Sequence, residues 1–276
     1  MEINKIYNEN CLDTMAKMPD NFIDLTVTSP PYDNLRTYKG YSFDFENVAK
    51  ELWRITKQGG VLVWVVGDAT INGSESLTSF KQAIFFVESC GFNLHDTMIY
   101  EKCGVMPSKT RYCQMFEYMF VFSKGKPKTT NIIKDRKNNW GNTKTGNIGQ
   151  RQKDGSVKKN GIKTISEFGS RFNIWRIMNE GGFMNKDVET KLHPAPFPEQ
   201  LANDHIKSWS NEGDLVYDCF MGSGTVAKMS ILNNRNFIGS EISSEYCNII
   251  EERIKKAWEE KRKEKDLQAG TLFGDG

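Results

Sequence analysis

The feature that most restricts the fold of this chain is a regular alternation of short apolar runs with longer segments of helical periodicity. Strand-like runs lie at 22–28, 61–67, 92–100, 115–122, 215–220 and 236–241. Helix-like segments lie at 43–57, 77–89, 199–210, 225–232 and 244–265. Such alternation is typical of βαβ units, which build a mostly parallel sheet covered by helices. The sequence therefore predicts an α/β fold.

Two of the strand-like runs, 92–100 and 115–122, follow each other with no helical segment between them. This order predicts an antiparallel pair that closes one edge of the sheet. The last helical segment carries an apolar residue at every fourth position, and the helix should pack by this stripe on the body of the protein. The members of that stripe are Tyr246, Ile250, Ile254 and Trp258.

Composition narrows the class of protein. Apolar residues make up 38% of the chain and charged residues 26%, which is the balance of a globular protein. The longest apolar run, 61–66, is much shorter than the roughly 20 residues of a membrane-spanning helix. The first residues lack the pattern of a secretory signal, so we expect a cytoplasmic protein. Six cysteines without a CxxC pair and three scattered histidines predict free thiols and no metal site.

Positive charge is concentrated in one segment. Residues 124–191 contain 16 Lys or Arg and 6 Asp or Glu, a net charge of +10, which leaves −8 for the rest of the chain. A basic segment in an acidic body is expected for a polyanion partner such as nucleic acid, although a solvated insertion would have the same composition. We predict four parts, which are residues 1–123, the insertion 124–191, residues 192–266 and a flexible tail at 267–276.

A glycine-rich turn follows one of the apolar runs. The run 215–220 leads into a Gly-Ser-Gly-Thr turn at 222–225 and then into a helical segment. A strand, a glycine turn and a helix N-terminus together expose backbone N–H groups to a ligand. Glu241 ends the next apolar run, where an acid can accept the hydroxyls of a ribose. The sequence contains neither GxGxxG, which binds dinucleotides, nor GxxxxGK(S/T), which binds nucleoside triphosphates. A nucleoside with a carboxylate tail is therefore the ligand that fits best.

A second turn follows the run 22–28 and reads Ser29, Pro30, Pro31 and Tyr32. The two prolines fix the turn and remove two N–H donors, so its carbonyl groups stay available as acceptors. The Ser29 hydroxyl and the Pro30 carbonyl can accept hydrogen bonds from an exocyclic amino group, and Tyr32 can stack on the ring. A duplex base must flip to reach such a site, and stacking offsets part of the cost of a few kcal/mol.

Together these motifs resemble the S-adenosylmethionine-dependent amino-methyltransferases of DNA in their permuted β-type arrangement. The turn at 29–32 is similar to the catalytic (Asp/Asn/Ser)-Pro-Pro-Tyr motif of that family, and 218–225 is similar to its cofactor loop. The resemblance implies S-adenosylmethionine as cofactor and double-stranded DNA as substrate. It also implies a Rossmann-like methyltransferase fold with a seven-stranded, mostly parallel sheet and an antiparallel edge strand. The order of the motifs implies that 124–191 is the target recognition region.

The resemblance further implies the site residues. Asn10 and Cys11 lie where the family usually reads Asp-Cys-Leu and lines the adenine pocket, and 193–198 resembles the element that holds the methionine end. The predicted catalytic residues are Ser29, Pro30, Pro31 and Tyr32. The predicted cofactor-binding residues are Asn10, Cys11, His193, Phe197, Pro198, Asp218, Phe220, Gly222, Ser223, Gly224, Thr225 and Glu241.

Cations and aromatic residues outside these motifs are the predicted DNA contacts. The loop after the catalytic turn carries Arg36, Tyr38 and Lys39, which should close over the flipped base and contact phosphate. Lys and Arg of the insertion should mostly contact phosphates, which adds affinity without sequence choice. The predicted contacts there are Lys137, Trp140, Lys144, Arg151, Lys158, Lys159 and Arg171.

The target atom is either N4 of cytosine or N6 of adenine. Serine at the first motif position is more often seen with cytosine in this family, so N4 of cytosine is favoured and N6 of adenine is the alternative. Methylation at C5 of cytosine requires a cysteine nucleophile, which the enzymes of that class carry in a Pro-Cys pair. None of the eight prolines of this chain precedes a cysteine, so that reaction is disfavoured. We expect direct transfer of the methyl group without a covalent enzyme intermediate.

Two rival classes stay open. A methyltransferase acting on a protein amide would share a similar turn, and a non-catalytic nucleic-acid-binding module could keep the same fold. The basic insertion and the order of the motifs argue against the first, and the intact turn and glycine loop argue against the second. A separate restriction endonuclease and a homodimer are partners that the resemblance allows.

Overall fold

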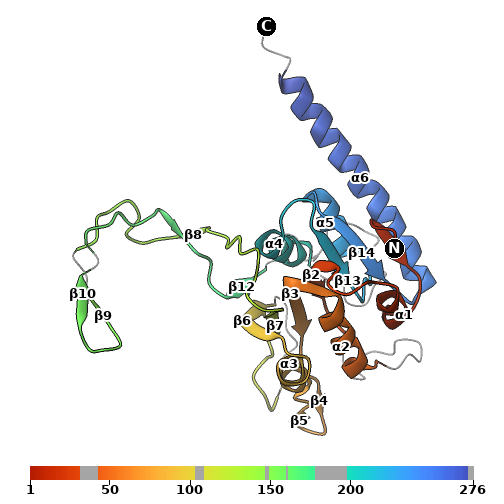
Figure 1. Cartoon of the computed structure of the whole chain (residues 1–276), viewed down its shortest axis with the longest axis horizontal. Coiled ribbons are helices and arrows are strands. Elements are labelled where there is room, and N and C mark those ends of the chain that lie inside the picture. Colours follow the sequence, from red (N-terminus) through yellow and green to blue (C-terminus); the bar gives the residue numbers. More distant parts are fainter. Residues whose placement is uncertain (32–42, 103–108, 147–148, 160, 178–197, 273–276) are drawn as a thin grey trace. The chain divides into compact units, whose positions relative to one another are not determined.

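The structure is a computed structural model that describes residues 1–31, 43–102, 109–146, 149–159, 161–177 and 198–272 (Figure 1). The chain separates into two compact units. The large unit comprises Met1–Asn131 and Asn173–Gly276, and the small unit comprises Ile132–Phe172. The division into four parts that the sequence suggests stays a prediction.

The large unit is built around an eight-stranded sheet of order β1-β14-β13-β2-β3-β7-β6-β12. Its strands are β1 (Lys5–Tyr7), β2 (Ile23–Thr28), β3 (Thr56–Val66), β6 (Asn93–Glu101), β7 (Phe116–Ser123), β12 (Ile174–Arg176), β13 (Leu215–Asp218) and β14 (Asn236–Ser240). The helices are α1 (Cys11–Ala16), α2 (Phe45–Ile55), α3 (Thr78–Glu88), α4 (Glu199–Trp209), α5 (Thr225–Leu232) and α6 (Ser244–Leu272). A small hairpin joins β4 (Thr70–Ile71) to β5 (Ser74–Glu75).

The predicted fold class, α/β with a mostly parallel sheet, is confirmed, and two details differ. The sheet has eight strands instead of seven, because β12 pairs in parallel with β6 at the sheet edge. The antiparallel strand is β7, and it lies between β3 and β6 instead of at the edge. Burial explains this position, because β7 is buried over its second half, whereas most of β6 is not.

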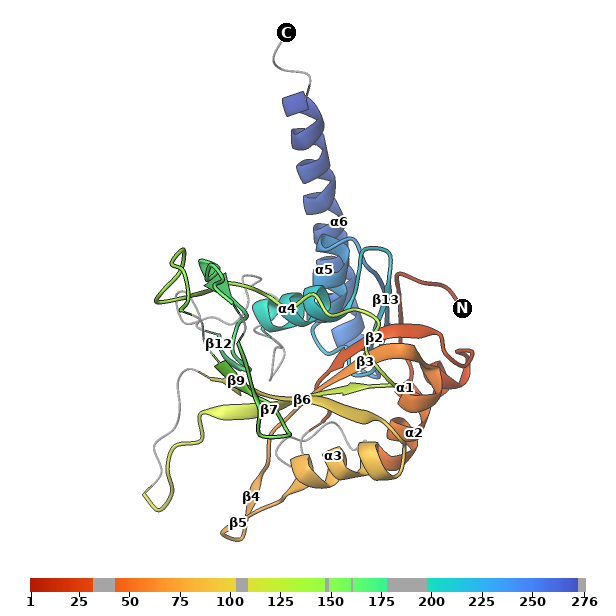
Figure 2. The same ribbon diagram turned by 60° about the vertical axis from the view of Figure 1, so that its left-hand side comes forward.

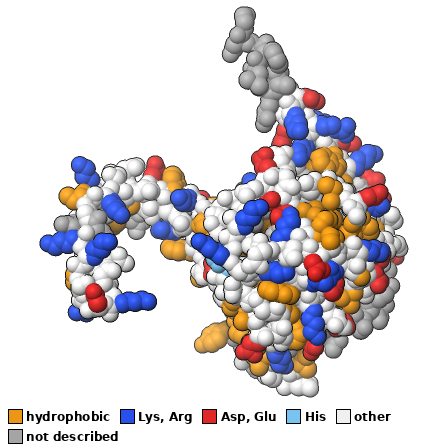
Figure 3. Space-filling view, in the orientation of Figure 1, with side chains coloured by type: hydrophobic (Ala, Val, Ile, Leu, Met, Phe, Trp, Pro, Cys, Tyr) orange, Lys and Arg blue, Asp and Glu red, His pale blue; other side chains and the backbone are white. Residues whose placement is uncertain are grey.

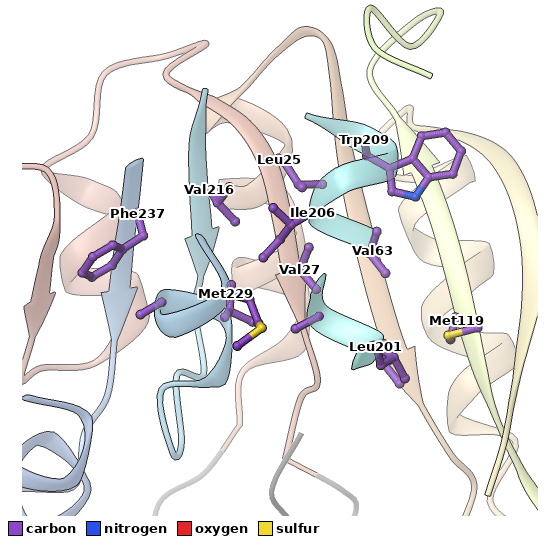
Figure 4. Close-up of a cluster of buried hydrophobic side chains, with 14 of the residues drawn as sticks. Leu25, Val27, Val63, Met119, Leu201, Ile206, Trp209, Val216, Met229 and Phe237 are labelled. Carbon is purple, nitrogen blue, oxygen red and sulfur yellow. The ribbon is translucent and has the colours of Figure 1, made fainter. Parts of the chain in front are cut away.

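Helices cover both faces of the sheet (Figure 2). Strand β3 shows why, since its residues alternate between two apolar clusters. Val61, Val63 and Val65 join the cluster under α4, α5 and α6, whereas Leu62 and Trp64 join the cluster under α1, α2 and α3. Figure 4 shows part of the first cluster, in which side chains of α4 and α5 meet those of the central strands. This packing holds the carboxyl ends of the strands in fixed positions.

The apolar stripe of α6 packs on the large unit as predicted. Ile250 is buried, and Ile254 and Trp258 are partly buried against the same cluster as α4 and α5. The helix continues to Leu272, past its expected end at residue 265. The residues after 265 include Leu, Gln and Ala, which are good helix formers, so nothing in the sequence stops the helix there.

The small unit consists of two antiparallel ribbons, in which β8 (Arg136–Lys137) pairs with β11 (Phe168–Gly169) and β9 (Gly149–Arg151) pairs with β10 (Val157–Lys159). None of its described residues is buried. Figure 3 shows many Lys and Arg side chains, and few acidic ones, on the visible surface of this unit. Hydrogen bonds and exposed side chains, rather than an apolar core, make up the unit.

Free thiols are confirmed for the cysteines that the structure describes, which are Cys11, Cys90, Cys113, Cys219 and Cys247. Cys103 lies outside the described residues. Within the described ranges, no helix has both the length and the apolar character that crossing a membrane requires.

Candidate functional site

The catalytic turn and the glycine loop lie at the same edge of the sheet. Strands β2 and β13 are parallel neighbours, with Tyr217 paired to Thr26, so the segments after Thr28 and Asp218 leave the sheet side by side. Strands β14 and β1 follow in the same direction, and they bring Glu241 and the start of α1 to this edge. The carboxyl ends of parallel strands form the usual ligand crevice of such sheets.

A buried hydrogen bond joins the two motifs. The Thr28 hydroxyl donates to Oδ1 of Asp218 at 2.7 Å, although the two residues are 190 positions apart in the chain. The backbone N–H of Phe220 donates to the same oxygen at 3.0 Å. The residue before the catalytic turn is therefore tied directly to Asp218, the last residue of β13, from which the chain enters the glycine loop.

The environment of Asp218 favours its protonated form. Burial raises the pKa of this carboxyl to about 7, and the nearby Glu241 acts in the same direction. The donors from Thr28 and Phe220 oppose the rise, because hydrogen bonds to a carboxylate stabilise its charged form. The buried Asp218 therefore titrates close to neutral pH.

The glycine loop needs its glycines for two reasons. Gly222 and Gly224 have φ angles of +55° and +80°, in the left-handed region that L side chains rarely adopt. A Cβ atom on Gly224 would also lie 2.7 Å from Cγ2 of Ile250 on α6. The loop turns back on itself through a hydrogen bond of 2.8 Å from the N–H of Gly224 to the carbonyl of Met221.

Glu241 holds the loop from the neighbouring strand. One carboxylate oxygen accepts the N–H of Gly222 at 2.8 Å, and the other accepts the N–H of Ser243 at 2.8 Å. Burial raises the pKa of Glu241, and these N–H donors oppose the rise. Each carboxylate oxygen has a second lone pair with which it can accept a ligand hydroxyl.

The first helix begins at the same edge. The Asn10 side chain caps α1 by accepting the N–H of Leu12 at 2.9 Å, and Cys11 is buried in the core under that helix. Burial raises the pKa of the Cys11 thiol to about 12, so it stays neutral. Their predicted contact with adenine stays a prediction.

The described part of the catalytic turn is partly accessible. Pro30 is buried, whereas Ser29 and Pro31 are half-buried. Phe220 of the glycine loop packs edge-on against Phe43, with ring centroids 5.3 Å apart.

Six of the predicted site residues lie outside the described residues, namely Tyr32, Arg36, Tyr38, Lys39, His193 and Phe197. Pro198 lies at the N-cap of α4.

The small unit carries the other predicted DNA contacts. Lys137, Lys144, Arg151, Lys158 and Lys159 are exposed, and Trp140 is 72% exposed. Arg171 differs from these, because its Nε donates to Asp135 at 2.9 Å across the ribbon. A hollow in the unit is lined by Arg136, Lys137, Asn138, Asn139, Trp140, Ile165 and Phe172.

Sequence reasoning missed two residues of this edge. Thr28 is hidden in an apolar run, and only its place just before the turn marks it. Asn8 follows a strand of three residues that is too short to show a period, and its side chain donates to the Glu241 carbonyl at 2.9 Å. Within the described residues, no group of three or more His, Cys, Asp or Glu is placed to hold a metal ion.

Known proteins resemble this chain over nearly its whole length. A family model described as DNA methylase matches residues 23–252. The orphan methyltransferase M.BamHII of Bacillus amyloliquefaciens is 61% identical over 239 residues, which cover 86% of this chain and 90% of that protein.

Solved structures share the fold. The PvuII DNA methyltransferase, described as cytosine-N4-specific, superposes with a TM-score of 0.66 at 21% identity and covers 98% of this chain and 93% of its own. A putative DNA modification methylase of Thermus thermophilus, solved with S-adenosyl-L-methionine, has a TM-score of 0.58 at 22% identity and covers 91% of this chain and 95% of its own.

The match to the family spans most of the chain, and it includes both the run before the catalytic turn and the whole glycine loop. The resemblance found in the motifs is thereby confirmed. This chain belongs to the family of DNA methylases that act on N6 or N4 amino groups.

Proposed function

We propose that this chain is a site-specific DNA methyltransferase that moves a methyl group from S-adenosylmethionine to the amino group of a flipped base, with N4 of cytosine favoured over N6 of adenine. The observation that carries the proposal is the 2.7 Å hydrogen bond between Thr28 and Asp218. It fixes the start of the catalytic turn against the start of the glycine loop, as a transfer between a base and a nucleoside cofactor requires.

The residues at the sheet edge fit this cofactor. S-adenosylmethionine is a nucleoside with an amino-acid tail, and when bound it supplies a methyl group activated by a sulfonium centre. Gly222 and Gly224 let the backbone approach a ligand closely, and Glu241 is placed to accept ribose hydroxyls. The Thermus methylase, which has the same fold, was solved with this cofactor.

The catalytic turn prepares the amino group. The nitrogen lone pair of an exocyclic amine is delocalised into the ring, which makes the amine a poor nucleophile. The Ser29 hydroxyl and the Pro30 carbonyl accept hydrogen bonds from the two N–H groups of the amine and draw these groups out of the plane of the ring. Tyr32 stacks on the base at the same time. The buried Pro30 holds its carbonyl in place for this role.

The choice of cytosine rests on Ser29 and is supported by the PvuII enzyme, which has the same fold and is described as cytosine-N4-specific. The small unit is proposed to contact the DNA, because its exposed Lys and Arg side chains can bind phosphates. The 61% identical relative is named an orphan methyltransferase, which supports an enzyme that acts without a partner endonuclease.

The test is to incubate the purified protein with unmethylated plasmid and isotope-labelled S-adenosylmethionine, and then to identify the labelled nucleosides by mass spectrometry. Labelled N4-methylcytosine is the expected product. Labelled N6-methyladenine would keep the reaction and correct the base. If no nucleoside is labelled although the cofactor binds, the substrate is not DNA or the chain is not catalytic.

Two variants separate the two halves of the site. Tyr32→Ala should lose turnover and keep cofactor binding, because the tyrosine acts on the base. Gly222→Val should lose cofactor binding, because a branched side chain is strained at a φ of +55° and fills the ligand's approach. Equal loss of cofactor binding in both variants would contradict the assigned role of Tyr32.

A further inference from the structure

A buried arginine lies beneath the glycine loop, and nothing in the proposed reaction uses it. The side chain of Arg253, on α6, is 0% exposed. A guanidinium stays charged in proteins, and a charge removed from water must be paired or bound by several acceptors. The acceptors that Arg253 contacts therefore indicate which part of the protein its side chain positions.

One arm of the guanidinium holds the loop itself. Nη1 of Arg253 donates to the backbone carbonyl of Ser223 and, at 3.2 Å, to the Thr225 hydroxyl. These acceptors lie on either side of Gly224, whose φ of +80° makes the turn. The backbone of the loop is therefore held from below at the residue where it changes direction.

The other arm is fixed by an acid on a different helix. Nη2 of Arg253 donates to Oε1 of Glu199 at 2.8 Å, and the ammonium of Lys228 on α5 donates to the same oxygen at 2.9 Å. All three side chains are largely buried, with exposed fractions of 0% for Arg253, 16% for Glu199 and 9% for Lys228. A planar guanidinium has fixed donor directions, so an anchor on one arm sets the direction of the other.

The position of the anchor in the chain links it to the cofactor. Glu199 begins α4 directly after Pro198, which is one of the predicted cofactor-binding residues. The loop is also held by Glu241, which accepts the N–H of Gly222. Two carboxylates therefore hold the loop, Glu241 directly and Glu199 through Arg253.

We propose that Arg253 is a positioning residue for the cofactor loop and that Glu199, the first residue of α4, orients it. The proposal rests on the proposed function in one respect, which is that the cofactor binds at this loop. The alternative is that Arg253 only fastens α6 to the large unit.

The main test is Arg253→Lys, which keeps the charge but replaces the planar fork with a single ammonium. Losing one charge-assisted hydrogen bond to the loop should weaken S-adenosylmethionine binding about tenfold, measured by calorimetry. Amide hydrogen exchange at 222–225 in the cofactor-free protein should also speed up about tenfold. Glu199→Gln should change both quantities in the same direction by less, because the loop contacts of Arg253 remain.

The matched control is Arg262→Lys, which makes the same change at an exposed position of the same helix. It should leave binding and exchange unchanged. A lower melting temperature for Arg253→Lys with unchanged cofactor affinity and unchanged loop exchange would show that Arg253 only fastens α6, and would overturn the proposal. If Arg253→Lys does not fold, Glu199→Gln decides in the same way.

Gly222→Val distinguishes failure of this inference from failure of the proposed function. If Gly222→Val loses the cofactor and neither Arg253→Lys nor Glu199→Gln weakens binding, the inference alone fails. If Gly222→Val binds the cofactor normally, the cofactor does not use this loop and the proposed site fails with it.

Discussion

The large unit and the small unit place their polar groups in different surroundings. At the sheet edge of the large unit, buried polar side chains bond to partners far away in the chain, as Thr28 does to Asp218. In the small unit, polar contacts are exposed, and some are local, as between Thr143 and the carbonyl of Trp140. The same kind of hydrogen bond therefore fixes the geometry of a site in one unit and only shapes a ribbon in the other.

The difference fits the two tasks proposed for the units. Chemistry on an amino group needs atoms held to within a fraction of an ångström, and a core buried on both faces of a sheet supplies that rigidity. Reading a DNA sequence needs exposed side chains that can differ between enzymes without disturbing a core. None of the described residues of the small unit is buried, so substitutions there should cost little stability.

The largest expected contrast is in pH dependence. Burial raises the pKa of Asp218 to about 7, from an ordinary value of 3.8, so the native state keeps a proton that the unfolded chain loses. The stabilisation this gives is complete below pH 3.8, declines up to about pH 7 and is then absent. Asp218→Asn should remove this decline, which is on the order of 4 kcal/mol at about 1.4 kcal/mol per pKa unit, as measured by urea unfolding across pH.

Asp135 in the small unit should behave in the opposite way. The hydrogen bond from Arg171 lowers the pKa of Asp135, so its stabilisation is present above the ordinary value and is lost as the pH falls. The side chain is 49% exposed, so Asp135→Asn should lower the opening free energy of the ribbon by less than about 1 kcal/mol, as measured by amide hydrogen exchange. Parallel pH profiles for wild type and Asp218→Asn would contradict the buried, protonated state assigned to Asp218.

Two glycines with nearly the same backbone angle give the next contrast. Gly224 has a φ of +80° and Gly155 a φ of +85°, so alanine at either position adds a similar strain of about 1 kcal/mol. At Gly224 the new Cβ would also lie 2.7 Å from Ile250, whereas nothing lies within 4 Å at Gly155. Overpacking should bring the cost of Gly224→Ala to about 3 kcal/mol, with loss of cofactor affinity.

Gly155→Ala serves as the internal control for backbone strain. It should lower the free energy of unfolding by about 1 kcal/mol and leave cofactor affinity unchanged. Equal costs in the two variants would mean that Ile250 moves aside and that the loop is held less tightly than its contacts indicate.

Sequence alone predicted the parts of the molecule that repeat a period. The alternating runs predicted β2 and β13 within a few residues, and α2, which buries one face, spans Phe45–Ile55 inside the predicted 43–57. Buried strands and amphipathic helices are local patterns, so a single sequence reveals them. The positions of the catalytic turn and the glycine loop followed, because both lie directly after such strands.

Sequence could not predict contacts that depend on tertiary pairing. Strand β12 is three residues long and joins β6 across 75 positions of the chain, so no local period marks it. The role of Arg253 is hidden in the same way, because a Glu-Arg-Lys-rich helix looks solvated until the structure shows which arginine turns inward. The sequence predicted the apolar stripe of α6, but it did not predict that Arg253 beside this stripe is buried.

A pair of threonines isolates the value of one hydrogen bond in each unit. Thr28→Val leaves the buried Asp218 without its 2.7 Å donor and should cost about 2 kcal/mol of unfolding free energy. The pKa of Asp218 should rise further. Thr143→Val removes a 2.6 Å bond to an exposed carbonyl that water can replace, and should cost less than about 0.5 kcal/mol. Similar costs in urea unfolding would argue against the contrast between buried and exposed bonding.

The smallest effect on stability is expected for the lysines of β10, whose replacement should clearly change the salt dependence of DNA binding. Lys158 and Lys159 are exposed on β10, so replacing both with alanine should leave the unfolding free energy within about 0.5 kcal/mol of wild type. If each contacts a phosphate, the slope of log affinity against log salt should fall by about 0.9 for each lysine removed, measured by DNA titration at several salt concentrations. Lys255→Ala, exposed on α6, is the control and should leave that slope unchanged. An unchanged slope in the double variant would place the DNA on another surface, because released counterions count phosphate contacts directly.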